Sequence, residues 1–230
     1  MTSRLGVLWD MDGVLVDSGE FHFQAWSEIL PDYGIAFSRE SFRAVFGMNN
    51  ARTLEALLGR PPAPKLLAEI SDRKERRFRQ AIQGRAQALP GVLDWLERLK
   101  SAGWRQAVAS SAPPENVDAL VDELGLRATF DALVSARGLP SKPEPALFFH
   151  AAHLIDVPPA RCVVVEDAVS GVEAAKRAGM RCIAVTTTNP ASALGAADVV
   201  VERLDALPAD VFQRLLNETG VKPFTKNENV

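Results

Sequence analysis

The chain has 230 residues, of which 47% are hydrophobic and 24% are charged, and its formal net charge at pH 7 is −3. A chain of this size can bury one large core, or a core plus an inserted domain. Both charge signs are mixed, no basic stripe with interleaved aromatic residues occurs, and no apolar stretch approaches the roughly 20 residues of a membrane span, so a nucleic-acid-binding or membrane-spanning protein is not expected.

The first residues and the two cysteines indicate the cellular compartment. The start of the chain has no apolar signal region, and Asp10 follows too soon for one. Cys162 and Cys182 each lie in an apolar run typical of a strand, which favours buried thiols over a disulfide framework or a zinc site. We therefore expect a soluble cytoplasmic protein without nucleic-acid or membrane partners, and a monomer.

Short apolar runs and amphipathic stripes alternate along most of the chain. The runs predict strands over residues 5–9, 106–109, 132–135, 162–165, 182–185 and, weakly, 199–201. None alternates apolar with polar residues, which is typical of strands covered on both faces. Apolar stripes at helical spacing between them predict helices over residues 92–99, 117–124, 148–155 and 170–178. The alternation predicts an α/β fold, a Rossmann-like parallel sheet sandwiched by helices.

The segment after the first strand has a different pattern. It shows helical stripes over residues 20–30, 41–46, 52–58 and 65–82, a proline-rich break at 60–64, and no good strand. We therefore predict an α/β core domain formed by residues 1–18 and 87–230. Residues 19–86 are predicted to form an all-helical domain inserted into it.

Polar residues follow several of the predicted strands at the point where each strand ends. In an open parallel sheet, ligands bind outside the carboxyl ends of the strands. The residues placed there by the predicted fold are Asp10 and Asp12, Ser110 and Ser111, Lys142 after a short loop, and Glu166 with Asp167. We expect these side chains to lie close together.

Four carboxylates in one cleft suggest a metal site. They would raise one another's pKa values, and a divalent cation removes that conflict. Oxygen ligands without His or Cys favour Mg²⁺ over zinc. Beside Mg²⁺, the partly desolvated Asp10 can attack phosphorus and form an aspartyl-phosphate. Asp12 can give a proton to the leaving oxygen and later accept one from the incoming nucleophile.

The stretch Ser-Lys-Pro-Glu-Pro at residues 141–145 is typical of a helix start. Ser141 would be the N-cap, proline would occupy the first turn, and Glu144 would complete a capping box. Lys142 would then oppose the helix dipole in that first turn. A bound phosphate in front of the helix would explain a cation at this place.

Together these residues resemble one known family. The motifs are DMDGVLVDS at 10–18, Ser110 in AVASS, Lys142 in SKPEP, and VVVEDAVSGVEAAKRAG at 163–179. In this order they resemble the haloacid dehalogenase-like superfamily of phosphotransferases over nearly the whole chain. Within it, the chain is similar to the branch that contains β-phosphoglucomutase and small sugar-phosphate phosphatases, which carries a helical cap after the first strand.

The resemblance implies a role for each core residue. Asp10 would be the nucleophile, and Asp12 the general acid/base, with its main-chain carbonyl also facing the metal. Ser110 would hydrogen-bond the transferring phosphoryl group, and Lys142 would hold that group against Asp10. The residues implied to carry Mg²⁺ are Asp10, Asp12, Glu166 and Asp167.

The resemblance extends less clearly into the helical insert. On pattern alone His22 lies on a stripe of packed residues, but GEFHFQAW at 19–26 resembles a β-phosphoglucomutase segment whose His helps to position the proton-transfer Asp. Lys74 resembles a lysine that meets the sugar. The mutase also carries an arginine that grips the phosphate not being transferred, and here FGMNNAR puts Asn50 at that place. Arg52, two residues on, points to another helix face. The substrate-binding candidates are His22, Gly47, Asn50, Arg52, Lys74 and Ser111.

Three functions remain open from the sequence. The first is a Mg²⁺-dependent phosphatase whose partner is a small phosphorylated metabolite such as a sugar phosphate. The second is a β-phosphoglucomutase, which interconverts β-glucose 1-phosphate and glucose 6-phosphate. The third is a non-catalytic signalling module that is phosphorylated on a strand-end Asp. Such modules lack a large helical insert and need no acid at Asp12.

Overall fold

The computed structural model describes residues 4–217. The chain divides into two compact units, one formed by residues up to Asp17 and from Gln87 onward, and the other by Ser18–Ala86. We call them the α/β unit and the helical unit. Residues 1–3 and 218–230, which belong to the predicted core domain, lie outside the described residues.

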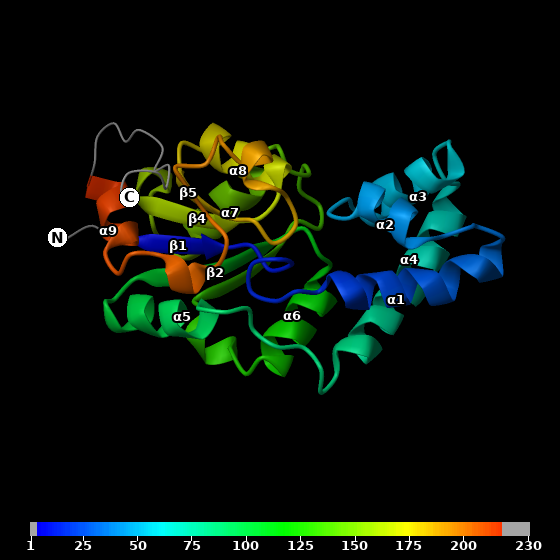
Figure 1. Ribbon diagram of the computed structural model, residues 1–230, viewed down its shortest axis with the longest axis horizontal. Coiled ribbons are helices and arrows are strands. Elements are labelled where there is room, and N and C mark those ends of the chain that lie inside the picture. Colours follow the sequence, from blue (N-terminus) through cyan, green and yellow to red (C-terminus); the bar gives the residue numbers. More distant parts are fainter. Residues whose placement is uncertain (1–3, 218–230) are drawn as a thin grey trace, which may run out of the picture. The chain divides into compact units, whose positions relative to one another are not determined.

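Six strands form one parallel sheet in the α/β unit (Figure 1). Their order across the sheet is β3-β2-β1-β4-β5-β6, and every neighbouring pair is parallel. Strands β1 and β4 are buried along their whole length, which explains why their apolar runs do not alternate. The strands are β1 (Gly6–Trp9), β2 (Arg105–Ser110), β3 (Ala132–Ser135), β4 (Cys162–Glu166), β5 (Arg181–Val185) and β6 (Val199–Val201). The predicted α/β fold with a parallel sheet is confirmed.

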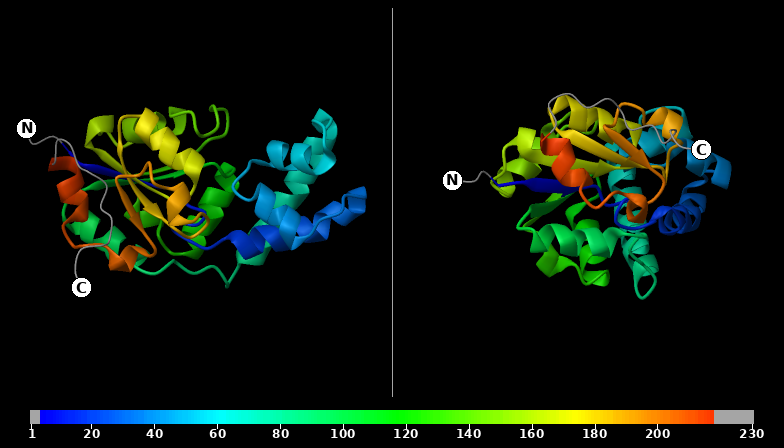
Figure 2. Two further views of the ribbon diagram at one scale, coloured as in Figure 1. Left: turned by 45° about the horizontal axis from the view of Figure 1, so that its top comes forward. Right: turned by 60° about the vertical axis from the view of Figure 1, so that its left-hand side comes forward.

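Helices pack on both faces of this sheet (Figures 1 and 2). On one face, α7 (Ala146–Leu154) and α8 (Val169–Arg177) form a core with Leu8 and Val164. On the other face lie α5 (Val92–Ser101), α6 (Pro114–Glu123) and α9 (Val211–Asn217). There the Phe212 ring lies 6.2 Å from that of Trp9, between ring centroids. Leu8 and Trp9 serve different cores because successive strand residues point to opposite faces. Helix α9 is not predicted from the sequence, because its seven residues make only about two turns of apolar pattern.

The helical unit contains α1 (Gly19–Ile29), α2 (Arg39–Val45), α3 (Asn50–Leu58) and α4 (Pro64–Ile82). A small apolar core joins them, with Trp26, Leu54 and Ile70 buried at its centre. The side chain of Ser38 caps α2, and that of Asn49 caps α3. Within Ser18–Ala86, all of which is described, the structure has helices and no strand.

The helix start predicted at residues 141–145 is wrong. Helix α7 begins only at Ala146, its N-cap is Pro145, and no side chain caps it. Proline disfavours helical geometry in the residue before it, so Pro145 keeps Glu144 outside the helix. The Glu144 amide instead donates to the Ser141 carbonyl at 3.0 Å and closes a turn. Lys142 therefore lies in a turn before the helix, and the dipole argument for its place does not hold.

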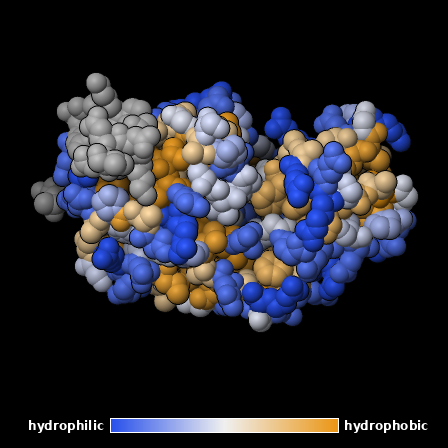
Figure 3. All heavy atoms as spheres, in the orientation of Figure 1, coloured by the Kyte–Doolittle hydropathy of each residue, from blue (hydrophilic) through white to orange (hydrophobic). Residues whose placement is uncertain are grey.

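The distribution of hydrophilic residues on the surface and the lengths of the apolar helices agree with the mixed charges and short apolar stretches of the sequence. Hydrophilic residues are spread over the face seen in Figure 3, with smaller apolar areas between them. Within residues 4–217, no helix combines the length and the apolarity that crossing a membrane would require.

Candidate active site

Asp10 lies where β1 leaves the core. Its amide donates to the Val165 carbonyl at 2.9 Å, so pairing with β4 continues one residue past β1. Trp9 is level with Val108 of β2 and Val165 of β4. This register brings Asp10 to the same sheet edge as the ends of both neighbouring strands. Its side chain is buried, although it is an acid.

Lys142 joins two of the acids at this edge. Its Nζ atom lies 2.5 Å from Asp10 Oδ1 and 2.5 Å from Glu166 Oε1. The Lys142 side chain is only 7% exposed, and the carboxylates on both sides are buried. These charge-assisted bonds link a turn before α7 to β1 and to β4.

Glu166 and Asp167 complete a buried acidic cluster with Asp10. Backbone amides of Asp167 and Ala168 both donate to Glu166 Oε2 at 2.9 Å, which fixes this carboxylate. The Thr188 hydroxyl donates to Asp167 Oδ2. The Asn189 side-chain amide donates to the Asp167 carbonyl at 3.0 Å.

Two glycines make room for these carboxylates. A Cβ atom built on Gly171 would overlap the Glu166 carboxylate, and one built on Gly13 would overlap that of Asp167. Gly13 also has a φ of 83°, a backbone conformation that favours glycine. Any side chain at either position would displace an acid from the cluster.

Burial dominates the electrostatics of the cluster. It raises the pKa of Asp10 from 3.8 to about 7, although the ammonium group of Lys142 opposes the shift. Burial, followed by the charges of Glu166 and Asp10, raises the pKa of Asp167. The pKa of Lys142 is also raised: burial alone would lower it, but the attraction of Asp10 and Glu166 is stronger. The cluster therefore favours additional positive charge.

The acidic cluster fits a divalent cation. One carboxylate oxygen from each of Asp10, Glu166 and Asp167 lies within 4.8 Å of the others. Three hard oxygen donors without His or Cys suit Mg²⁺ or a similar ion. The Asp12 side chain does not belong to this group. The resemblance assigned the main-chain carbonyl of Asp12, and not its side chain, to the metal, and that role stays a prediction.

Ser110 and Ser111 lie at the end of β2. Ser110 ends β2 and is buried, and its hydroxyl accepts a hydrogen bond from the Ala112 amide at 3.0 Å, which fixes Oγ. Ser111 is exposed. Their predicted contacts with a phosphoryl group or substrate stay predictions.

A second polar cluster lies within the helical unit. Lys74 Nζ is 2.9 Å from His22 Nδ1 and 2.9 Å from Glu75 Oε1. The Asn50 side-chain amide donates to the same Glu75 oxygen at 2.8 Å. The His22 ring stacks on that of Phe78, with 4.1 Å between centroids. Three substrate-binding candidates, His22, Asn50 and Lys74, thus meet in one place, whereas Gly47 and Arg52 are exposed.

Sequence reasoning missed several residues that organise these clusters. Gly13 and Gly171 stand in the quoted motifs, but only the packing shows what they leave room for. Glu75 lies in the charged stretch RKERR at 73–77, a pattern typical of a solvated helix face, yet it is buried. Thr188 lies in a loop of polar residues, and no sequence signal pairs it with Asp167.

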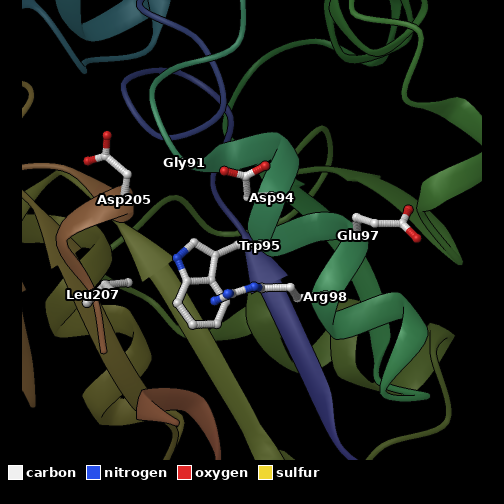
Figure 4. A pocket seen from close by; sticks show the side chains of 7 residues that line it. All are labelled: Gly91, Asp94, Trp95, Glu97, Arg98, Asp205 and Leu207. Atoms are coloured by element: carbon white, nitrogen blue, oxygen red, sulfur yellow. The ribbon is translucent and has the colours of Figure 1, made fainter. Parts of the chain in front are cut away.

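The α/β unit also has a cavity of about 480 Å³ beside α5 (Figure 4). The Trp95 indole and the exposed residues Asp94 and Arg98 line it. It contains none of the candidate site residues.

Comparisons with known proteins place the chain in a family. A family model described as haloacid dehalogenase-like hydrolase matches residues 5–179. Beta-phosphoglucomutase of Bacillus subtilis (strain 168) is 33% identical over 214 residues, which cover 90% of this chain and 92% of that protein. Fructose-1-phosphate phosphatase YqaB of Escherichia coli (strain K12) is 32% identical over 183 residues, covering 78% of this chain and 95% of the phosphatase.

Solved structures and longer relatives agree with this placement. The crystal structure of CbbY from Rhodobacter sphaeroides in complex with phosphate has a TM-score of 0.81 at 29% identity, covering 89% of this chain and 96% of CbbY. The chain spans only 18% of protein SUPPRESSOR OF QUENCHING 1 and 55% of 5-amino-6-(5-phospho-D-ribitylamino)uracil phosphatase, both chloroplastic proteins of Arabidopsis thaliana. Because the family model matches most of the sequence and two bacterial relatives align over nearly their whole length, the chain belongs to the haloacid dehalogenase-like hydrolase family.

Proposed function

We propose that this protein is a Mg²⁺-dependent phosphatase that hydrolyses a small phosphorylated metabolite, such as a sugar phosphate, through an aspartyl-phosphate on Asp10. The observation that carries the proposal is the contact of one buried ammonium group, Lys142 Nζ, with both Asp10 and Glu166 in a cluster of three buried carboxylates. A relative named as a fructose-1-phosphate phosphatase, and a solved structure of CbbY in complex with xylulose-(1,5)bisphosphate, support the substrate class.

The proposed reaction assigns a separate task to each residue. A carboxylate oxygen of Asp10 attacks phosphorus, and the bond from phosphorus to the leaving oxygen breaks while Asp12 gives that oxygen a proton. Asp12 then takes a proton from water as the water oxygen attacks phosphorus, which releases phosphate and restores Asp10. Lys142 and Ser110 neutralise and orient the phosphoryl oxygens. When bound by Asp10, Glu166 and Asp167, Mg²⁺ supplies the positive charge that offsets the acids and the phosphate.

The helical unit supports hydrolysis over the mutase reaction. A mutase must hold a second phosphate, and the resemblance gives that task to an arginine where this chain has Asn50. Here the Asn50 amide donates to the Glu75 carboxylate, whose negative charge would repel a phosphate. Arg52 is exposed and belongs to another helix face. The contact of His22 with Lys74 keeps the mutase as the second candidate.

We also propose that residues 19–86 act as a cap domain, with hinges at 17–19 and 86–90. Two compact units joined at these segments support the proposal. Closure over a phosphate should protect both linkers from proteolysis in the presence of Mg²⁺ and a phosphate analogue. Equal cleavage rates with and without these additions would contradict it. Cytoplasmic location and the monomeric state remain expectations from the sequence.

A phosphate-release screen over phosphorylated metabolites, run beside a mutase assay, tests the function. The mutase assay follows β-glucose 1-phosphate to glucose 6-phosphate with a trace of bisphosphate primer. We expect Mg²⁺-dependent phosphate release from sugar phosphates without efficient isomerisation. Isomerisation faster than release would favour the mutase, and a long-lived phospho-Asp10 without turnover would favour the signalling module.

A further inference from the structure

The loop after β5 contacts the acidic cluster from the side opposite to β1 in the strand order. Its residues Thr188 and Asn189 both donate to Asp167, one to the side chain and one to the main chain. The Thr186 amide donates to the Val201 carbonyl at 3.0 Å, which ties the beginning of this loop to β6. The loop therefore holds Asp167 from an anchored position.

The Thr188 hydroxyl is a neutral donor to a carboxylate of the cluster, whereas the other described donors to these carboxylates are the Lys142 ammonium group and backbone amides. Lys142 contacts Asp10 and Glu166, and backbone amides contact Glu166. At Asp167, the described contacts of the carboxylate include the Thr188 hydroxyl. A hydroxyl orients a carboxylate without cancelling its charge, so the attraction for a cation is kept.

Gly13 limits how Asp167 and Thr188 can arrange themselves. A Cβ atom on Gly13 would overlap the Asp167 carboxylate and would lie 3.0 Å from Thr188 Oγ1. The backbone after β1 thus packs directly against the bonded pair. Asp167 is 3% exposed, so water has little access to replace the hydroxyl.

We propose that Thr188 is a positioning residue for the metal site, in which its hydroxyl holds one oxygen of Asp167 and thereby sets the direction of the other toward the cation. The inference rests on the proposed Mg²⁺ site. It concerns the affinity of the protein for the metal, apart from any substrate.

Two hydroxyl-free variants and one conservative variant test this role in the full-length protein without substrate. Thr188→Val keeps the shape of the side chain, Thr188→Ala adds no new atoms, and Thr188→Ser keeps the hydroxyl. Thr187→Val is the matched control, because Thr187 is an exposed neighbour in the same loop. Binding is measured as the Mg²⁺ dependence of the melting temperature, and with Mn²⁺ by the electron paramagnetic resonance signal of the free ion.

We expect both hydroxyl-free variants to weaken metal binding by about 10- to 100-fold, the usual effect of removing a partner of a metal ligand. Thr188→Ser and Thr187→Val should bind within about twofold of wild type, and the melting temperature of these two variants without metal should change little. Wild-type affinity in both Thr188→Val and Thr188→Ala would overturn the inference. If wild-type protein itself binds neither ion, the proposed metal site fails instead, so the two failures are distinguishable.

Discussion

The acidic cluster of the α/β unit and the polar cluster of the helical unit, both within residues 4–217, are balanced in opposite ways. In the α/β unit, the single ammonium group of Lys142 faces the three carboxylates of Asp10, Glu166 and Asp167, and the pKa values of Asp10 and Asp167 are raised. In the helical unit, the Glu75 carboxylate accepts hydrogen bonds from Lys74 and Asn50, and Lys74 also contacts His22. Burial tends to raise the pKa of Glu75, but the electrostatic effects of Lys74 and His22, together with the hydrogen bonds from Asn50 and Lys74, outweigh it, and the pKa is lowered.

This difference indicates that the acidic cluster is suited to bind a cation, whereas the charges of the helical cluster compensate one another. A buried excess of negative charge lowers stability until a cation arrives, and such a cost is typical of functional sites. A buried acid with adequate donors stabilises the fold and keeps its neighbours in fixed positions. We therefore expect the acidic cluster to control turnover and the helical cluster to contribute chiefly to stability and substrate positioning.

The largest expected effect is on turnover in Asp10→Asn. An amide is a poor nucleophile, so phosphate release should fall by at least about 10⁴-fold, as when other catalytic nucleophiles are removed. Asp94→Asn, on the exposed face of α5 in the same unit, is the matched control and should keep wild-type activity. Initial rates of phosphate release with the best substrate of the screen measure both. Substantial turnover by Asp10→Asn would exclude the acidic cluster as the reaction centre.

Asp12→Ala should reduce turnover by about 10²- to 10⁴-fold, the range for general acid–base groups. The loss arises because the leaving oxygen no longer receives a proton. Formation of the phospho-enzyme, followed by rapid quench, should therefore be impaired less with p-nitrophenyl phosphate, whose leaving group needs no proton. An equal loss with both kinds of substrate would contradict this role of Asp12.

The sequence predicts which carboxylates form the acidic cluster, but it predicts few of the residues that hold them in place. Buried parallel strands appear as unbroken apolar runs, and parallel strands end at one sheet edge, so Asp10, Glu166 and Asp167 were expected together. Lys142 also lies there, although the predicted Ser141 helix start is wrong. Thr188 could not be predicted as a partner, because its contact depends on how the loop after β5 folds back onto the end of β4.

A pair of neutralising variants should change stability in opposite directions. Without metal at neutral to alkaline pH, Asp167→Asn removes a buried charge whose pKa is raised, so the melting temperature should rise. Glu75→Gln removes the charge that Lys74 faces and should cost about 1–3 kcal/mol in the free energy of unfolding. Thermal and urea unfolding measure the two effects.

The addition of Mg²⁺ distinguishes the two clusters further. It should stabilise wild type and Glu75→Gln alike, because the helical cluster holds no part of the proposed metal site, and it should have a much weaker effect on Asp167→Asn. Destabilisation of the metal-free protein by Asp167→Asn would show that the charges of the acidic cluster are compensated without a cation. The proposed difference between the two clusters would then be wrong.

The smallest effect concerns the pH dependence of the helical cluster. The folded-state pKa of Glu75 lies below its ordinary value of 4.5, so its contribution to stability is present above that value and is lost as the pH falls through the folded-state pKa. The difference in the free energy of unfolding between wild type and Glu75→Gln should therefore be constant near neutral pH and shrink in acid. Urea unfolding over a pH series measures it, with Glu69→Gln, an exposed acid on the same helix, as control. A difference that grows in acid would mean that Glu75 is held in its neutral form, and that both buried clusters resist negative charge.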